Sequence, residues 1–258
     1  MTERMAGRTA LVTGGGSGIG RAICRRLASK GATVRVLDLD AGAANAVVTE
    51  IEAAGGAASG HAADVGDRAD VARAVGETLA LGPIDALVNN AGIAHVGTVE
   101  TTSEEDLDRL YRVNVKGAYN LLSAVVPGMK ARKSGAIVNI ASVAATVAVG
   151  ERFAYSMTKG AILAMTYSVA KDYVAHGIRC NAVSPARVHT PFVDEFLDRY
   201  YADNRDEVFE KLAKSQPIGR MGTPDEIAGL VAYLCSDEAA FVTGSNFPID
   251  GGFVTLNS

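Results

Sequence analysis

The sequence predicts an α/β fold built on a single doubly wound parallel sheet. Three observations predict it. Short apolar runs alternate with segments of helical periodicity, about every 25 residues. The first apolar run ends in a glycine-rich turn that leads into a helix. With 48% hydrophobic and 21% charged residues, a chain of 258 residues can bury a large core. Right-handed crossovers then place helices on both faces of the sheet.

The first half of the chain contains three strand–helix pairs. The first pair is a strand at 9–13 that ends in glycines and a helix at 19–27 that is closed by Gly31. The second is a strand at 33–37 that ends at Asp38 and a helix at 41–54 that is broken by two glycines. The third is a weaker strand at 57–63 and a helix at 67–81 that is stopped by Gly-Pro. A strand at 84–88 follows and ends in Asn-Asn-Ala-Gly.

The second half continues the alternation. Ser103 starts a long helix, with Asp106 three residues on as an imperfect capping box. Strands are expected at 136–140, 178–183 and 247–249, and a second long helix at 153–175. Thr223 opens the last helix, which has proline at its first position and an acid at its third. No linker interrupts the pattern, so residues 1–258 are expected to form one domain.

Residues 190–216 depart from the alternation. They carry seven acidic and four basic side chains together with five aromatic ones: Phe192, Phe196, Tyr200, Tyr201 and Phe209. The pattern predicts an amphipathic helical insertion. It is either a solvated surface pair or a lid over a pocket at the strand ends, and the lid is favoured because ligands of open α/β sheets bind beyond the carboxyl ends of strands.

Composition excludes several classes of function. The chain has 25 basic and 29 acidic residues and a net charge of −4, which argues against a nucleic-acid partner. No apolar stretch is long enough to span a membrane, and none precedes the first strand as a secretory signal would. Cys24, Cys180 and Cys235 are scattered, which is typical of free thiols in a reducing compartment rather than of a disulfide framework or a metal site. A cytoplasmic protein is expected.

The turn after the first strand has the features of a phosphate-binding loop. Its glycines are spaced as Gly14, Gly18 and Gly20, with Ser17 and Ile19 between them. Glycines there let the backbone approach a pyrophosphate, and the N-terminus of the following helix offers free N–H groups. A plain turn is the alternative. The strand–turn–helix context and an acid at the end of the second strand favour a dinucleotide.

That acid is Asp38. A carboxylate at this strand end accepts hydrogen bonds from adenosine ribose hydroxyls and repels a 2′-phosphate. No lysine or arginine lies at positions 14–20 or 39–40 to neutralise such a phosphate. The sequence therefore favours NAD over NADP, and a merely solvated loop acid is the alternative.

Tyr155 and Lys159 form an i, i+4 pair on one helix face. A nearby ammonium favours the phenolate and is expected to lower the pKa of the tyrosine, which suits proton exchange with an alcohol or ketone. Ser142 follows the strand at 136–140 and can hydrogen-bond a developing alkoxide. A surface pair is the alternative interpretation of Tyr155 and Lys159.

Taken in order, these motifs resemble the short-chain dehydrogenase/reductase family over nearly the whole chain. The matching segments are TGGGSGIG at 13–20, Asp64-Val65, NNAG at 89–92, Asn114, Ser142, the Tyr155–Lys159 pair and NAVSP at 181–185. The resemblance implies a Rossmann-type subunit, usually tetrameric, that transfers hydride between a nicotinamide and a secondary alcohol or ketone.

The resemblance also implies roles for individual residues. Tyr155 would be the acid/base, Ser142 would orient the substrate, and Lys159 would tune the tyrosine and hold the nicotinamide ribose. Asn114 would hold a helix kink and a water of a proton relay. For the cofactor, the implied contacts are Asp64 and Val65 to adenine, Asn90 near the adenosine ribose, and Val188 and Thr190 to the carboxamide. The family usually has Pro-Gly where this chain has Pro185-Ala186, so alanine needs a backbone angle there that a β-carbon tolerates.

Four unused side chains lie near the expected strand ends: His95, Arg152, Arg187 and His189. Arg152 is three residues before Tyr155, and a planar guanidinium suits a carboxylate. It could equally pair with a lid acid such as Asp194 or Glu195. His95 could line the pocket or stabilise its own loop. Arg187 could share the substrate's acid group with Arg152.

Two shorter resemblances bear on the substrate. SPARVHTPF at 184–192 and QPIGRMG at 216–222 resemble dehydrogenases of 2-keto-3-deoxy sugar acids, such as L-fuconate and rhamnonate derivatives. The segment around Arg152 resembles cytosolic 3-hydroxybutyrate dehydrogenases. A small hydroxy acid is therefore expected. The alternatives are a 3-oxoacyl thioester reductase and, outside enzymes, a catalytically silent regulator that binds a dinucleotide.

Overall fold

Seven parallel strands form the centre of the structure, in the order β3-β2-β1-β4-β5-β6-β7. They are β1 (Thr9–Thr13), β2 (Thr33–Asp38), β3 (Ala57–Ala62), β4 (Ala86–Asn89), β5 (Gly135–Ile140), β6 (Ile178–Pro185) and β7 (Asn246–Ile249). The computed structural model describes residues 5–256, except for the side chains at positions 192, 195, 196, 199 and 200. The predicted doubly wound sheet is confirmed.

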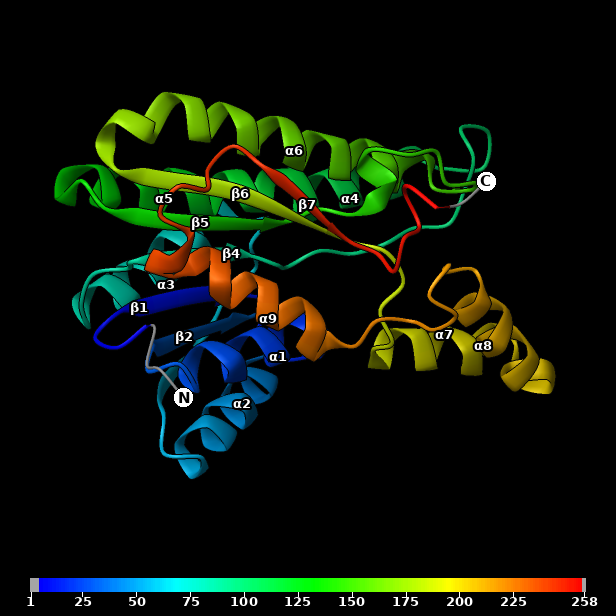
Figure 1. Cartoon of the computed structure of the whole chain (residues 1–258), viewed down its shortest axis with the longest axis horizontal. Helices are drawn as coiled ribbons and strands as arrows, with labels where there is room; N and C mark the ends of the chain where they lie inside the picture. Colours follow the sequence, from blue (N-terminus) through cyan, green and yellow to red (C-terminus); the bar gives the residue numbers. More distant parts are fainter. Residues whose placement is uncertain (1–4, 257–258) are drawn as a thin grey trace.

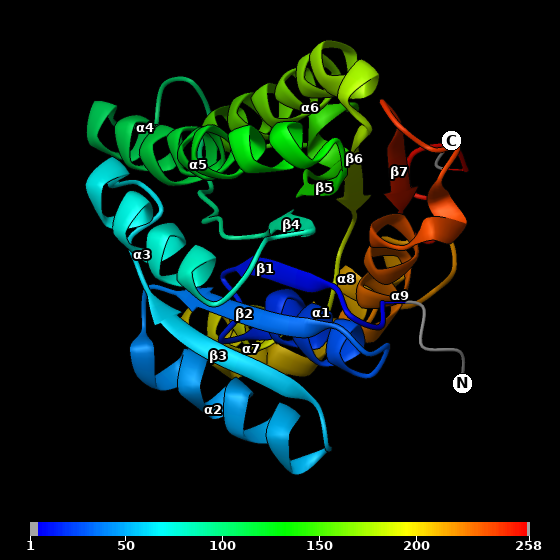
Figure 2. The same cartoon turned by 90° about the vertical axis from the view of Figure 1, so that its left-hand side faces the viewer.

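Helices cover both faces of this sheet (Figure 1). One face packs against α1 (Gly18–Ala28), α2 (Ala41–Ala53) and α9 (Pro224–Cys235). The other packs against α3 (Arg68–Ala80), α5 (Gly117–Arg132) and α6 (Phe153–Tyr173), and α4 (Glu104–Leu110) leads into α5. Figure 2 shows these two layers on opposite sides of the strands. The inner strands β1, β4 and β5 are mostly apolar on both sides because both of their faces are buried, whereas the edge strands β3 and β7 are largely only partly buried.

The order of the strands reverses between β1 and β4. From β1 the chain builds outward through β2 to β3, and from β4 it builds in the opposite direction to β7. The turns after β1 and β4 therefore lie side by side, which makes this the switch point where open α/β sheets bind ligands. The catalytic candidate Ser142 follows β5, and Val188 and Thr190 follow β6, along the same edge.

The predicted long helix from Ser103 runs without a break, but its hydrogen-bonding pattern changes along its length. Ser103 caps α4 by accepting a hydrogen bond from the N–H of Asp106, as expected. Between α4 and α5, however, residues Tyr111–Lys116 form a π-helical segment, η1. A π segment widens a helix by one residue per turn, and such segments occur mostly at functional sites. Asn114 lies within it.

The insertion at 190–216 is helical, as predicted. It contains α7 (Pro191–Tyr200), a short 3₁₀ turn η4 (Ala202–Asn204) and α8 (Arg205–Lys214). Arg205 holds the two helices together, with ion pairs of 2.7 Å to Asp194 and 2.8 Å to Asp198. Figure 1 shows the pair projecting beside the carboxyl ends of β6 and β7. No helix within residues 5–256 has the length and apolar character needed to cross a membrane.

Candidate active site

The glycine-rich turn after β1 can be built only from glycines at several positions. Gly14 has a φ of +61°, and a β-carbon on Gly20 would lie 1.9 Å from the carbonyl oxygen of Gly14. Ser17 is the N-cap residue of α1, yet its side chain makes no capping hydrogen bond. The turn thus presents an uncommitted hydroxyl and the free N–H groups of a helix N-terminus. This cradle fits the pyrophosphate of a dinucleotide.

Asn90 joins this turn to the end of β4. Its side-chain amide donates to the carbonyl oxygens of Thr13 at 3.0 Å and Gly14 at 3.1 Å. The Thr13 hydroxyl in turn accepts from the backbone N–H groups of Asn90 and Ala91, both at 3.0 Å. Asn90 therefore shapes the loop that would hold the cofactor. Both hydrogens of its side-chain amide are donated to that loop.

Asp38 faces the same turn from the end of β2. One carboxylate oxygen accepts from the N–H of Gly16 at 2.8 Å, and the other accepts from the N–H of Asp40 at 3.1 Å. A β-carbon on Gly16 would lie 2.9 Å from the Asp38 carboxylate. Among the described residues, no lysine or arginine forms an ion pair with Asp38. Its negative charge at the expected ribose position is therefore not neutralised.

Asp64 and Val65 follow β3, one strand further along. The Asp64 carboxylate accepts from Arg112 at 2.6 Å and from the N–H of Gly66 at 2.8 Å. The Arg112 hydrogen bond is the main reason why the pKa of Asp64 is lowered. Val65 is buried against Gly117 of α5. The backbone and apolar surface here, rather than a free carboxylate, remain for an adenine ring.

Val188 and Thr190 lie beyond the end of β6. Val188 is buried, and the segment around it pairs with Gly222 through two hydrogen bonds of 2.9 Å. Thr190 lies close to Gly18 of the glycine-rich turn, since a β-carbon added to that glycine would be 3.7 Å from the β-carbon of Thr190. Ala186 is not among the residues with positive φ, so the alanine that replaces the family's glycine is accommodated without strain.

Tyr155 and Ser142 approach each other from α6 and from the end of β5. The Ser142 hydroxyl accepts from the N–H of Ala144 at 3.2 Å, which holds it at the start of a short 3₁₀ turn, η2 (Val143–Ala145). A hydrogen bond links Ser142 to the phenol of Tyr155 and lowers its pKa. The charge of Arg152 lowers it as well. Ser142 and Arg152 thus both act on the phenol of Tyr155.

Burial of Tyr155 has a larger effect than Ser142 and Arg152 together, so the pKa of its phenol is raised. The expectation that Lys159 lowers this pKa is wrong for the structure. The Lys159 ammonium donates to the carbonyl oxygen of Ile140 at 2.8 Å, and it lies 5.7 Å from the centre of the Tyr155 ring. Burial also lowers the pKa of Lys159, from 10.5 to about 8.

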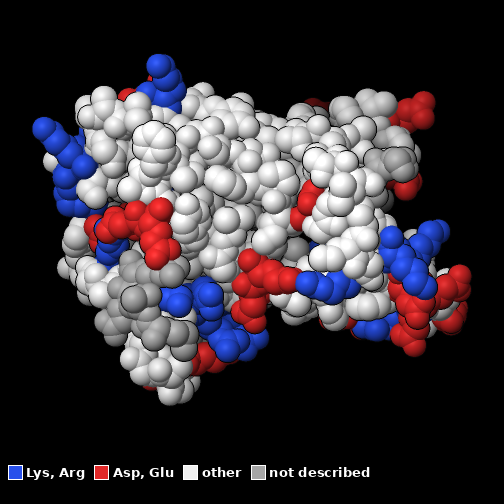
Figure 3. All heavy atoms as spheres, in the orientation of Figure 1, with Lys and Arg blue, Asp and Glu red and all other residues white. Residues whose placement is uncertain are grey.

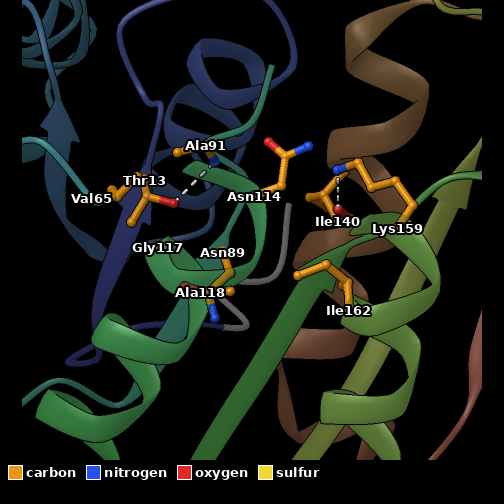
Figure 4. A pocket seen from close by; sticks show the side chains of 10 residues that line it. All are labelled: Thr13, Val65, Asn89, Ala91, Asn114, Gly117, Ala118, Ile140, Lys159 and Ile162. Atoms are coloured by element: carbon orange, nitrogen blue, oxygen red, sulfur yellow. Dashed lines mark hydrogen bonds between the residues drawn. The ribbon is translucent and has the colours of Figure 1, made fainter. Parts of the chain in front are cut away.

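Asn114 connects the π segment to the site. Its side-chain oxygen accepts from the N–H of Ile93 at 2.8 Å, and its amide donates to the Ile93 carbonyl and the Thr158 hydroxyl, each at 3.0 Å. Asn114 and Lys159 both line a cavity of about 10 Å³ (Figure 4). A single water needs about 10–15 Å³, so the cavity has room for the one relay water that the sequence implies.

Two arginines supply positive charge near Tyr155. Arg152 is the N-cap residue of α6, and its guanidinium donates to the Glu151 carbonyl at 3.0 Å. Its charge lowers the pKa of Arg187 as well as that of Tyr155. No described acid pairs with Arg152. Asp194 instead contacts His189 at 3.0 Å and Arg205, and the side chain of Glu195 lies outside the described residues.

The two histidines occupy structural positions. His95 lies with Nδ1 3.8 Å from Asp106, and its Nε2 is buried beside Gly97 without a hydrogen-bond partner. The contact with Asp106 fits the loop-stabilising alternative, and the role of His95 in lining the substrate pocket stays a prediction. His189 pairs with Asp194 of α7 and lies edge-on to the Phe209 ring of α8 at 5.0 Å, so it braces these two helices.

Sequence reasoning missed two contributors. Gly16 is not part of the expected glycine spacing, yet its N–H holds Asp38. Glu151 has a left-handed φ of +56°, which turns the chain into α6 just before Arg152. The sequence signal for Gly16 was the run of three glycines, since no other residue fits between Asp38 and Ala43. Among the described residues, no three His, Cys, Asp or Glu side chains lie together to hold a metal ion.

The buried ammonium of Lys159 is expected to make the free energy of unfolding depend on pH. Between pH 8 and 10.5 the unfolded chain holds a proton at this lysine that the folded protein has released. Stability therefore rises with pH across this window, and the cost of the buried charge is fully present below it. Lys159→Met should stabilise the protein at pH 7 by about 1–4 kcal/mol while abolishing activity. Thermal unfolding from pH 7 to 10 measures this.

The control for that measurement is Lys171→Met, which removes a lysine from the same helix away from the pocket. It should leave the pH dependence of wild type in place. A Lys159→Met variant that is less stable than wild type at pH 7, or that keeps the rise in stability above pH 8, would contradict the assignment.

Comparisons with known proteins agree with this geometry. A family model described as enoyl-(acyl carrier protein) reductase matches residues 14–254. The chain is 39% identical to 2-(S)-hydroxypropyl-CoM dehydrogenase 3 of Xanthobacter autotrophicus, covering 99% of this chain and 100% of the relative. It is also 39% identical to 2-keto-3-deoxy-L-fuconate dehydrogenase of Xanthomonas campestris pv. campestris, covering 97% of this chain and 81% of the relative.

A solved structure shares the fold closely. The gluconate 5-dehydrogenase of Burkholderia cenocepacia, determined in complex with NADP and tartrate, superposes with a TM-score of 0.90 at 35% identity. The match covers 99% of this chain and 98% of that one. The similarity therefore extends over the sheet, the site and the helical insertion together.

Proposed function

Because the chain belongs to the short-chain dehydrogenase/reductase family, and is thus an oxidoreductase acting on CH–OH groups, we propose that it interconverts the secondary alcohol and ketone of a small hydroxy acid with NAD(H). One observation carries the proposal. The Lys159 ammonium, 5.7 Å from the centre of the Tyr155 ring, lines one cavity together with Asn114 and with Thr13 of the strand that leads into the cradle for a dinucleotide. We propose 2-keto-3-deoxy sugar acids as the first candidates, since one close relative bears that name.

The residues divide the chemistry among them. When bound, the nicotinamide dinucleotide supplies or accepts the hydride. The Tyr155 phenol gives a proton to the ketone oxygen, or its phenolate removes one from the alcohol, and the Ser142 hydroxyl holds that oxygen in place. Lys159 keeps a positive charge beneath the ring. A water beside Asn114 and Lys159 would pass the proton onward through the small cavity.

We propose that NAD is the preferred cofactor. Support comes from Asp38, whose carboxylate is fixed by Gly16 and has no basic partner among the described residues. A 2′-phosphate would meet that charge directly, and a like-charge juxtaposition costs several kcal/mol. The Burkholderia relative was determined with NADP, so the choice varies between proteins of this fold and must be measured for this chain.

The experiment is a panel of hydroxy acids assayed with NAD⁺ and with NADP⁺. We expect turnover of at least one sugar acid, with a higher kcat/KM for NAD⁺. Asp38→Asn keeps an oxygen for the Gly16 N–H but removes the charge, so it should shift the preference toward NADP⁺ by about tenfold to a hundredfold. Asp40→Asn, which changes the neighbouring helix cap, is the matched control. A wild-type preference for NADP⁺ would refute the cofactor assignment.

The same panel separates the alternative functions. A 3-oxoacyl thioester reductase would turn over thioesters better than free acids, and Asp38 argues against the NADPH that such enzymes normally use. A 3-hydroxybutyrate dehydrogenase would turn over the four-carbon acid best. Arg152 and Arg187 favour a free carboxylate in either case, because they supply the charge that an acid requires.

We also propose a cytoplasmic homotetramer. The three cysteines of the chain are free and buried, which suits a reducing compartment. β7 is an edge strand, and Tyr111, Tyr119 and Phe241 expose their rings to solvent. Figure 3 shows few charged side chains over α6, β6 and β7, whereas α7 and α8 are densely charged. Further copies of the chain would cover these exposed rings and the weakly charged surface over α6, β6 and β7. Sedimentation velocity measures the size of the assembly.

A further inference from the structure

A second, larger cavity lies beyond the ends of β6 and β7. Its volume is about 180 Å³. A single water needs only about 10–15 Å³, so this space admits a small organic molecule. Ile218, Ile227 and Ile249 contribute apolar lining, whereas Arg187 and Gln216 bring polar groups to it.

Gln216 is the unusual member of this lining. It is only 2% exposed, and its side-chain oxygen has no hydrogen-bond partner. Its side-chain nitrogen donates to the Ser215 hydroxyl at 3.0 Å. That hydroxyl gives its own hydrogen to the Leu212 carbonyl at 2.6 Å, so the atom facing it must be a donor. The amide is therefore fixed with its oxygen unpaired, and burying an unpaired acceptor is costly.

The other charged groups around the cavity are already paired. Arg220 binds Glu226 at 2.6 Å, and the Asp250 carboxylate accepts from the N–H groups of Gly252 and Val254. Arg187 alone remains. Its Nε donates to Ser215 at 3.1 Å, and among the described residues no acid forms an ion pair with its guanidinium. The cavity thus offers one cationic donor beside one neutral acceptor.

The cavity adjoins the segment that is expected to contact the nicotinamide. Gly222 lines it and also pairs with the Arg187–His189 segment around Val188, the expected carboxamide contact. Arg187 interacts with Arg152, which in turn interacts with Tyr155. A ligand held by Arg187 would therefore lie beside the segment that is expected to contact the nicotinamide.

We propose that this cavity is the subsite for the acid end of the substrate and that Gln216 accepts a hydrogen bond from a hydroxyl on the carbon next to the carboxylate. The inference rests on the proposed function and narrows its substrate class. It selects α-hydroxy acids, or 2-keto sugar acids in their cyclic hemiketal form, which carry the same hydroxyl. An acid without that hydroxyl, such as 3-hydroxybutyrate, leaves the Gln216 oxygen unpaired.

The test compares tartrate with succinate, which is the same four-carbon diacid without hydroxyls. Calorimetry on the full chain with NAD⁺ present should show tartrate binding about three- to tenfold more tightly, the contribution of one neutral hydrogen bond. Gln216→Met keeps the side-chain length and should remove this preference without weakening succinate. Arg187→Met should weaken both diacids by about tenfold or more.

Three outcomes would overturn the inference: wild type binds neither diacid, it binds both equally, or Gln216→Met weakens both to the same extent. If Gln216→Met does not fold, Ile249→Phe serves instead, since it narrows the cavity from its apolar wall and should weaken both diacids together. These measurements need no turnover. A complete lack of hydroxy-acid turnover would therefore overturn the proposed function while the binding result still decides the cavity.

Discussion

Replacing Tyr155 with phenylalanine is expected to lower kcat by about 10²- to 10⁴-fold. The phenol interacts with Ser142, and the Lys159 ammonium lies 5.7 Å from the centre of the Tyr155 ring, so the variant loses the group that moves the proton. The ring and its packing remain, and no cofactor-holding residue changes. Affinity for NAD⁺, measured by titration, should therefore equal that of wild type while steady-state turnover falls.

The pH dependence of the same enzyme adds a second readout. Because burial raises the pKa of Tyr155, the phenol keeps its proton at neutral pH and is ready to donate it to a ketone. Oxidation of the alcohol needs the phenolate, so its kcat/KM should rise with pH as that proton is lost. Tyr173→Phe, at the far end of α6, is the matched control and should leave both rates unchanged. Wild-type turnover by Tyr155→Phe would show that the mechanism is wrong.

The fold could be predicted from local signals because each element carried its own. Apolar strand runs ended in residues that cannot continue a strand, and Ser103 and Thr223 capped helices where expected. The π segment carried no such signal. It forms where Asn114 binds the backbone of Ile93, which belongs to the loop after β4. A contact between residues 21 positions apart does not appear in helical periodicity.

In the candidate site, too, local features could be predicted from the sequence and features that depend on packing could not. Glycine spacing and the Tyr155–Lys159 pair lie within single turns of the chain, so the sequence displayed them directly. The pKa of Tyr155 could not be predicted, because burial depends on how α6 packs against β5. The larger cavity depends on Arg187, Gln216 and Ile249, which three separate segments bring together. Neither composition nor spacing relates those residues to one another.

Arginine at position 152 is expected to recognise the substrate's acid group. It lies beside Tyr155 in a chain whose net charge of −4 would otherwise repel an anion. A hydrogen bond to a charged group contributes about 1.5–3 kcal/mol. Arg152→Met should therefore raise the KM for the acid by about tenfold to a hundredfold, with a smaller effect on kcat. The matching amide of the substrate, which has no charge, should lose far less.

Arg187 can compensate for the loss of Arg152, because the two positive charges are close enough for Arg152 to lower the pKa of Arg187. The double variant Arg152→Met/Arg187→Met removes both and should raise the KM for the acid further than either change alone. Two residues that serve one carboxylate are coupled, so the double effect should differ from the sum of the two single effects in free energy. If acid and amide then suffer equally, no carboxylate is recognised there, and the hydroxy-acid assignment fails even though the dehydrogenase chemistry at Tyr155 stands.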